Sequence, residues 1–245
     1  MMNGINIPPV VKNLLIINGI FFLATLVFEQ QGKDLADILG AHYFDSPKFR
    51  IWQPITYMFM HGSFQHIFFN MFGLFMFGGI LEQKWGAKKF INFYFITGLG
   101  ALALQWVVQG IELYQITGAV INHGNLPLDM LAEGKYNPAV YTDSQASTLH
   151  AVYFGGMVGA SGAIFGIMTA FAVIYPNMEM MLIFVPFPVK AKYFIPIYIV
   201  IELFLGVARI PGDTVAHFAH LGGALIGFIL AKIWNDKDRF YKYYE

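Results

Sequence analysis

A serine and a histidine far apart in the chain stand in surroundings that suit acid–base chemistry. Ser161 lies in the run Gly159-Ala160-Ser161-Gly162, and His220 lies in the run Ala219-His220-Leu221-Gly222-Gly223. A serine hydroxyl becomes a strong nucleophile when a base such as an imidazole can accept its proton. Gly-x-Ser-Gly is a weak signal alone, because a serine can also cap the amino terminus of a packed helix. The presence of His220 in another apolar segment favours a catalytic role for Ser161.

A second group of polar side chains lies between His61 and Asn70. His66 and Asn70 are four residues apart, so their side chains point to the same side of a helix. Two hydrogen-bond donors that face one cavity can stabilise the oxyanion of an attacked carbonyl. His61 precedes them by more than one turn, and we expect it to bond to backbone rather than to substrate.

The same histidines allow a competing interpretation as a metal site. His61, His66, His217 and His220 can in principle gather a cation, and the one carboxylate near them in sequence is Asp213. The His-Glu-x-x-His pattern of zinc hydrolases is absent from the chain. We therefore expect no metal ligand and no cofactor.

The composition places these residues in a membrane protein. Of the 245 residues, 57% are hydrophobic and 12% are charged, whereas about a quarter of the residues in soluble domains are charged. The formal net charge of zero gives no reason to expect a nucleic acid partner, and the absence of cysteine excludes disulfides and a thiol nucleophile. A membrane-spanning helix needs about 20 apolar residues. We predict six spans: Val10–Phe28, Phe64–Leu81, Phe90–Val108, Gly162–Tyr175, Tyr193–Ala208 and Ala216–Trp234.

The fourth predicted span is too short for a bilayer. Its 14 residues, Gly162–Tyr175, reach roughly 21 Å, whereas the hydrocarbon core is about 30 Å thick. If the helix ends at the inner surface, Ser161 lies about 10 Å below the outer one. Irregular backbone is tolerated at that depth where it is buried in protein or lines a water-filled cavity. A helix amino terminus there also offers free N–H groups to a developing oxyanion.

Small residues can bring the fourth and sixth spans together. Gly162, Gly166 and Ala170 form a stripe on one helix, and Gly223 and Gly227 follow His220 on one face of the other. Membrane helices approach closely where such stripes meet. This packing is expected to bring His220 within hydrogen-bond distance of Ser161.

The positive charges predict an orientation. With a cytoplasmic amino terminus, ten of the fifteen lysines and arginines fall on the inner side. Both termini are then cytoplasmic, and we expect an integral protein of a bacterial plasma membrane. The polar stretch from Gln109 to His150, which contains Gly, Pro and Asn, is expected to be one outward-facing loop insertion between the third and fourth spans.

Together these residues resemble the rhomboid family of intramembrane serine proteases. The marks are His61 and His66 with Asn70, the run Gly159–Gly162, and Ala219-His220 with Gly223 and Gly227. Further marks are the run Gly78–Glu82 with Gly86, and Trp52 with Thr56. The chain departs from the family at Trp52-Gln53, where many members have Trp-Arg. Each motif alone is a weak signal for the family, but the whole set in this order is a strong one.

The resemblance implies a single membrane domain over residues 1–245, an all-α bundle of six helices with a short sunken fourth helix. It implies a Ser161–His220 dyad without an acidic third member, acting on the transmembrane segments of single-span proteins in the lipid bilayer. The oxyanion hole would combine the backbone at Ala160 and Ser161 with His66 and Asn70. Gly162 and His61 would support this site. Phe165 stands where some members stack a tyrosine on the histidine.

Two further alternatives to a protease remain, and the role of Glu202 is open. A catalytically silent rhomboid-like protein that binds membrane clients would be expected to lack Ser161 or His220, and both are present. A small transporter would favour internal symmetry and paired half-helices, which the sequence does not display. Glu202, midway along the fifth predicted span, is interpreted as a structural residue in preference to a part in water or proton supply. The sequence predicts neither the oligomeric state nor the substrate.

Overall fold

The computed structural model describes residues 7–181, 187–208, 210, 213 and 215–242, and side chains as far as residue 235. The described chain is mostly helical, with one antiparallel hairpin of two short strands, β1 (Glu179–Met180) and β2 (Val189–Lys190). The helices are α1 (Pro9–Glu29), α2 (Leu35–Leu39), α3 (Gln53–Thr56), η1 (Tyr57–Phe59), α4 (Phe64–Gly73), η2 (Leu74–Gly78), α5 (Gly79–Trp85), α6 (Ala87–Thr117), α7 (Leu128–Ala132), α8 (Asp143–Phe154), α9 (Ser161–Ile174), α10 (Ala191–Ala208) and α11 (His217–Lys242).

Five helical stretches in the described residues are long and apolar enough to cross a membrane, and α9 is a shorter apolar helix of 14 residues. The second stretch joins α4, η2 and α5, with a π-helical turn at Leu74–Gly78. The helical membrane bundle is therefore confirmed, and the short helix predicted over Gly162–Tyr175 is observed as Ser161–Ile174. The long stretches are Pro9–Glu29, Phe64–Trp85, Ala87–Thr117, Ala191–Ala208 and His217–Asn235.

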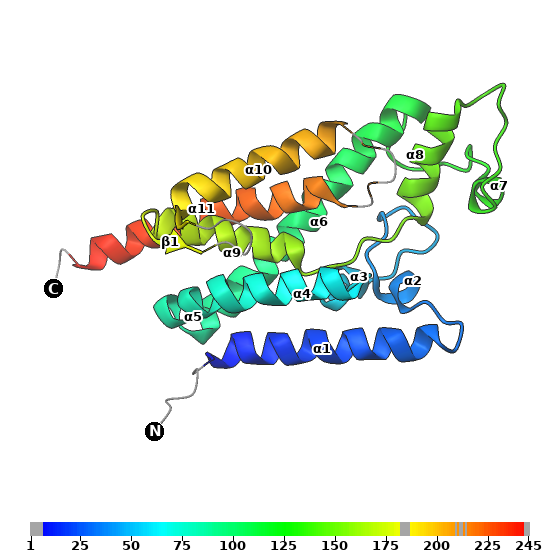
Figure 1. Cartoon of the computed structure of the whole chain (residues 1–245). Coiled ribbons are helices and arrows are strands. Elements are labelled where there is room, and N and C mark those ends of the chain that lie inside the picture. The colour runs from blue at the N-terminus through cyan, green and yellow to red at the C-terminus, as the bar shows by residue number, and fades with distance from the viewer. Residues whose placement is uncertain (1–6, 182–186, 209, 211–212, 214, 243–245) are drawn as a thin grey trace.

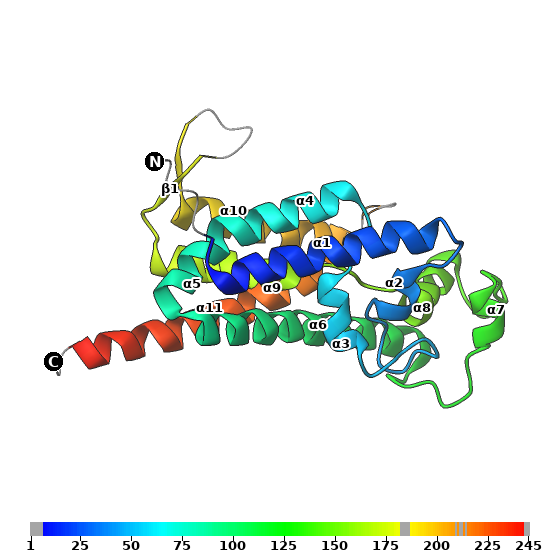
Figure 2. The ribbon, with the colours of Figure 1, turned by 90° about the horizontal axis from the view of Figure 1, so that it is seen from below.

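The short helix α9 lies at the centre of the bundle. In Figure 1 it lies between α4 on one side and α11 on the other, and every residue from Gly162 to Phe171 is buried. The start of α1 and the end of α11 lie at the same end of the bundle, while α7 and α8 lie at the opposite end (Figures 1 and 2). This arrangement agrees with an even number of crossings.

Glycines allow α9 and α11 to touch through their backbones. A Cβ atom added at Gly223 would come within 1.8 Å of the carbonyl oxygen of Gly162, and one added at Gly227 within 2.5 Å of the backbone of Gly166. No side chain larger than hydrogen fits at either place without moving a helix. The prediction that the two stripes of small residues face each other is confirmed.

The stretch from Gln109 to His150 was expected to be one long loop. The structure contradicts this, because helices occupy both ends of the stretch. Helix α6 continues to Thr117 and ends at Gly118, which has the left-handed conformation that favours glycine. Helix α8 starts with a capping box between Thr142 and Gln145. It buries four side chains (Ala146, Leu149, Val152 and Tyr153), and the last three belong to a small core that also includes Tyr43 and Leu113. Apolar burial stabilises helices here that the polar composition concealed.

An extended segment leads from α8 down to Ser161. Met157 pairs with Ala41 in an isolated antiparallel bridge, and the N–H of Gly159 donates to the carbonyl of Tyr57 at 2.9 Å. The amide of Gln53, which is fully buried, ties the neighbouring loop together, because it accepts from the N–H of Arg50 and donates to the carbonyl of Lys48. Glutamine thus has a structural role at the position where the sequence departs from the family pattern.

Candidate active site

Ser161 and His220 meet at the carboxyl-terminal end of this extended segment. Ser161 is the first residue of α9, and its Oγ lies 2.8 Å from Nε2 of His220 in the first turn of α11. Ala160 is the residue that caps α9, and it has no side-chain hydrogen bond to the helix. The alternative in which Ser161 merely caps the helix is therefore wrong.

The acidic neighbour of His220 is Glu202 in α10. One carboxylate oxygen of Glu202 lies 2.7 Å from Nδ1 of His220 and 2.7 Å from Nδ1 of His217. The other ring nitrogen of His217 lies 2.9 Å from the carboxylate of Asp213. The sequence predicts a structural role for Glu202, and the family resemblance implies a dyad without an acidic member, but the structure brings Glu202 into direct contact with His220.

His66 lies beside the backbone that precedes Ser161. Gly159 has φ +131°, and a Cβ atom there would come within 2.8 Å of Nε2 of His66 and 3.4 Å of Oγ of Ser161. The backbone N–H of Gly62 makes a long contact of 3.5 Å to the other ring nitrogen, Nδ1. That contact favours the tautomer in which Nε2 carries the proton and can donate it beside Ser161.

Asn70 is one turn further along α4 and is 6% exposed. Its side-chain Nδ2 has no hydrogen-bond partner among the described residues. A buried donor without a partner destabilises a fold by about 1–3 kcal/mol. An unpaired Nδ2 at this position therefore suits a group that donates to a bound ligand. The amino terminus of α9 adds further donors, because the first N–H groups of a helix, here from Ser161 and Gly162, have no acceptor within it.

Two aromatic contacts fix the imidazoles. The ring of Phe165 stacks on His220, with centroids 4.4 Å apart and planes 9° apart. His61 is buried, and its ring meets that of His66 edge to face at 5.0 Å. Burial, together with the neighbouring His66, lowers the pKa of His61 to about 3, so His61 is uncharged near neutral pH.

The four histidines considered for a metal site are not gathered at one point. Among the described residues, the groups close enough to share an ion are His217 and His220 with Glu202. His61 and His66 do not belong to that group.

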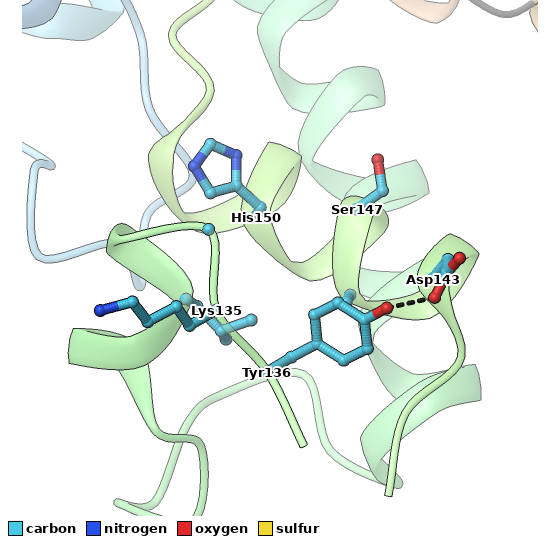
Figure 3. Close-up of a pocket in the computed structure, with 8 residues that line it drawn as sticks. Lys135, Tyr136, Asp143, Ser147 and His150 are labelled. Carbon is cyan, nitrogen blue, oxygen red and sulfur yellow. Dashed lines mark hydrogen bonds between the residues drawn. The ribbon is translucent and has the colours of Figure 1, made fainter. Parts of the chain in front are cut away.

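A separate surface hollow of about 420 Å³ lies between α7 and α8 (Figure 3). Its lining includes Lys135, Ser147 and His150, with Tyr136 donating its hydroxyl to Asp143. None of the predicted site residues lines this hollow.

Comparison with models of protein families shows to which family this chain belongs. The profile of the rhomboid domain matches residues 48–120 and 135–236. This chain belongs to the rhomboid family. The match includes Ser161, Glu202 and His220, and it leaves the extent of a single domain over residues 1–245 as a prediction.

Individual relatives give a consistent result. Rhomboid protease AarA of Providencia stuartii is 30% identical over 195 residues, which cover 74% of this chain and 54% of that protein. A mitochondrial rhomboid protein of Schizosaccharomyces pombe, described as uncharacterized, is 27% identical over 210 residues, covering 77% and 53%. Rhomboid protease GlpG of Salmonella newport is 39% identical over 62 residues, covering 25% and 21%. The chain spans about half the length of the first two of these relatives.

The names of the relatives also concern the kind of membrane in which the protein was expected to lie. Relatives with mitochondrial or chloroplastic names are among the matches. An integral membrane protein is supported, and the expectation of a bacterial plasma membrane is not.

Proposed function

We propose that this rhomboid is an intramembrane serine endopeptidase, with Ser161 as nucleophile and His220 as general base. The single observation that carries the proposal is the 2.8 Å contact between Ser161 Oγ and His220 Nε2 at the amino terminus of a short, buried helix. A serine with an adjacent imidazole and unpaired helix N–H groups has the parts that peptide hydrolysis needs.

The reaction would proceed in two halves. Ser161 Oγ attacks the carbonyl carbon of the peptide while its proton passes to Nε2 of His220. The carbonyl oxygen becomes an oxyanion beside the first N–H groups of α9, with His66 and Asn70 as further donors. His220 then gives its proton to the amine that leaves, and an ester remains on Ser161. Water attacks this ester with His220 again acting as base, so the carboxylic acid is released and the serine is restored.

The proposed substrate class is the transmembrane segment of single-span membrane proteins. A nucleophile at the start of a 14-residue helix would be about 10 Å below the bilayer surface that the longer helices reach. A substrate helix must unwind there, because its hydrogen-bonded carbonyls are shielded, and helix-weakening residues reduce that cost. Gly159, Gly162 and Phe165 lie close around Ser161, so a small residue is expected before the cut. With both termini cytoplasmic, cleavage would fall in the outer part of the span.

Reaction of the purified protein in detergent with a fluorescent fluorophosphonate tests the nucleophile. Ser161 should form a stable phosphonyl adduct, because its Oγ attacks the phosphorus and displaces fluoride while His220 takes the serine proton. Mass spectrometry of the peptide that contains Ser161 locates the label. Ser147→Ala is a matched control, since Ser147 lies exposed on α8 and outside the proposed active site.

Labelling should be lost in Ser161→Ala and kept in Ser147→Ala. Absence of any label on the unmutated protein would favour the alternative, a catalytically silent rhomboid that binds membrane clients. Label on Ser161→Ala at the unmutated rate would exclude Ser161 as the nucleophile.

Asn70→Ala is expected to slow cleavage of a single-span reporter by about 10- to 1000-fold, since it removes one oxyanion donor. Stability should change little or rise, because Asn70 Nδ2 has no partner among the described residues. Initial rates and thermal unfolding in the same detergent separate the two effects. An unchanged rate would remove Asn70 from the site.

A further inference from the structure

The buried face of α10 carries one acidic side chain. The buried residues of this helix are Ala191, Ile195, Glu202 and Gly206. Glu202 is 4% exposed, although an ionised carboxylate in a membrane bundle is strongly disfavoured unless it is paired. Its partners are therefore expected to matter.

Hydrogen bonding restricts where the protons of this cluster can lie. An ionised carboxylate can only accept, so the Nδ1 atoms of His217 and His220, each 2.7 Å from the same oxygen of Glu202, must both carry protons. With its proton on Nδ1, a neutral His220 has a lone pair on Nε2, the atom that lies 2.8 Å from Ser161 Oγ. This is the tautomer that can accept the serine proton.

His217 balances the charge of Glu202. Its two ring nitrogens face carboxylates, Glu202 at 2.7 Å and Asp213 at 2.9 Å, and an imidazole with protons on both nitrogens donates to both. The hydrogen bond from His217 lowers the pKa of Asp213, so Asp213 is ionised near neutral pH. Gly206 lets α11 approach at this level, because a Cβ atom there would come within 3.1 Å of the Cβ atom of His217.

We propose that Glu202 is the positioning residue of the catalytic histidine, which makes the site a Ser161–His220–Glu202 triad held in place by His217 and Asp213. Glu202 fixes the tautomer and the orientation of His220, and it stabilises the imidazolium that forms when His220 takes the serine proton. No atom of Glu202 contacts the substrate. The inference rests on the proposed function, because a positioning residue requires an active Ser161.

A metal ion is the competing use of the same three groups. The ligand atoms of Glu202, His217 and His220 lie within 4.8 Å of one another, but each 2.7 Å separation is a hydrogen-bond distance. With a proton between each nitrogen and the oxygen, a cation cannot enter without displacing both. EDTA is therefore expected to leave fluorophosphonate labelling of Ser161 unchanged, and loss of labelling that zinc restores would overturn the triad.

Glu202→Gln tests the positioning role at nearly constant side-chain volume. A glutamine N–H can donate to Nδ1 of His220 and so hold the proton on Nε2, the wrong tautomer for accepting a proton from Ser161. The rate of fluorophosphonate labelling at Ser161 should fall by about 10²- to 10⁴-fold. Glu82→Gln is the matched control, because Glu82 is a carboxylate 3% exposed that accepts from the N–H groups of Val10 and Val11, far along the chain from Ser161. Its labelling rate should equal that of the unmutated protein.

Nuclear magnetic resonance of the unmutated protein gives a readout that does not depend on activity. In protein labelled with ¹⁵N-histidine, the His220 signals, assigned by their loss in His220→Ala, should report a proton on Nδ1 and none on Nε2. A neutral His220 with its proton on Nε2 would overturn the proposal. So would a Glu202→Gln protein labelled within about twofold of the unmutated rate, a threshold far below the expected 10²-fold loss. If the unmutated protein takes no label, the proposed function itself fails, and the two failures are thereby distinguished.

Discussion

Replacing His220 with alanine is expected to reduce cleavage of a transmembrane reporter by about 10⁴-fold or more. The imidazole is the group that contacts Ser161 Oγ, at 2.8 Å, and without it the hydroxyl keeps its proton. Members of a catalytic unit are strongly non-additive. The double variant Ser161→Ala/His220→Ala should therefore be little slower than either single variant. Initial rates in detergent and in proteoliposomes measure all three.

An exposed histidine supplies the control for this experiment. His123 lies in the segment between α6 and α7 and is exposed, so His123→Ala should cleave at the unmutated rate. Additive losses in the double variant would mean that Ser161 and His220 act independently. That result would contradict the proposed mechanism even if each single loss were large.

The features that the sequence predicted well depend on local composition. A run of apolar residues has to lie in a helix when lipid cannot satisfy backbone groups, so the spans and the short α9 could be found from length alone. The stripes at Gly162 and Gly223 could be found as well, because residues three and four apart share a helix face. The orientation in the membrane stays a prediction.

The contact between Glu202 and His220 could not be found in this way. Glu202 and His220 are on different helices, 18 residues apart, and their meeting depends on the relative height of α10 and α11. Packing around Gly206 and His217 sets that height. The periodicity of apolar residues along one helix carries no information about such packing between helices. A signal was present, because an acidic residue within a predicted span seldom lacks a function.

The region after α6 was missed for a different reason. Polar residues with Gly and Pro were interpreted as loop, while the box of Thr142 and Gln145 is a short signal for a helix start. The apolar positions Leu149 and Val152 in that helix are three apart, as one buried helix face requires. Both signals are weaker than the overall polarity of the segment, so the loop interpretation prevailed and was wrong.

Gly223→Ala is expected to damage both stability and activity, because the two helices of the active site touch at this point. The added methyl would come within 1.8 Å of the Gly162 carbonyl oxygen, a distance at which α9 and α11 have to separate. Overpacking of this kind lowers the free energy of unfolding by about 1–3 kcal/mol. A displacement of 1 Å at the reacting groups costs about 10²-fold in rate, and His220 is one turn away from the contact.

Gly19→Ala is the matched control for this change. Gly19 lies within α1, and a Cβ atom there meets nothing within 4 Å, so alanine should be neutral or slightly stabilising through its higher helix propensity. Thermal unfolding in detergent and reporter cleavage are measured on both variants. If Gly223→Ala keeps both the stability and the rate of the Gly19→Ala protein, then α9 and α11 do not meet as described. The geometry that joins Ser161 to His220 would then fail with them, because that contact depends on the same approach of the two helices.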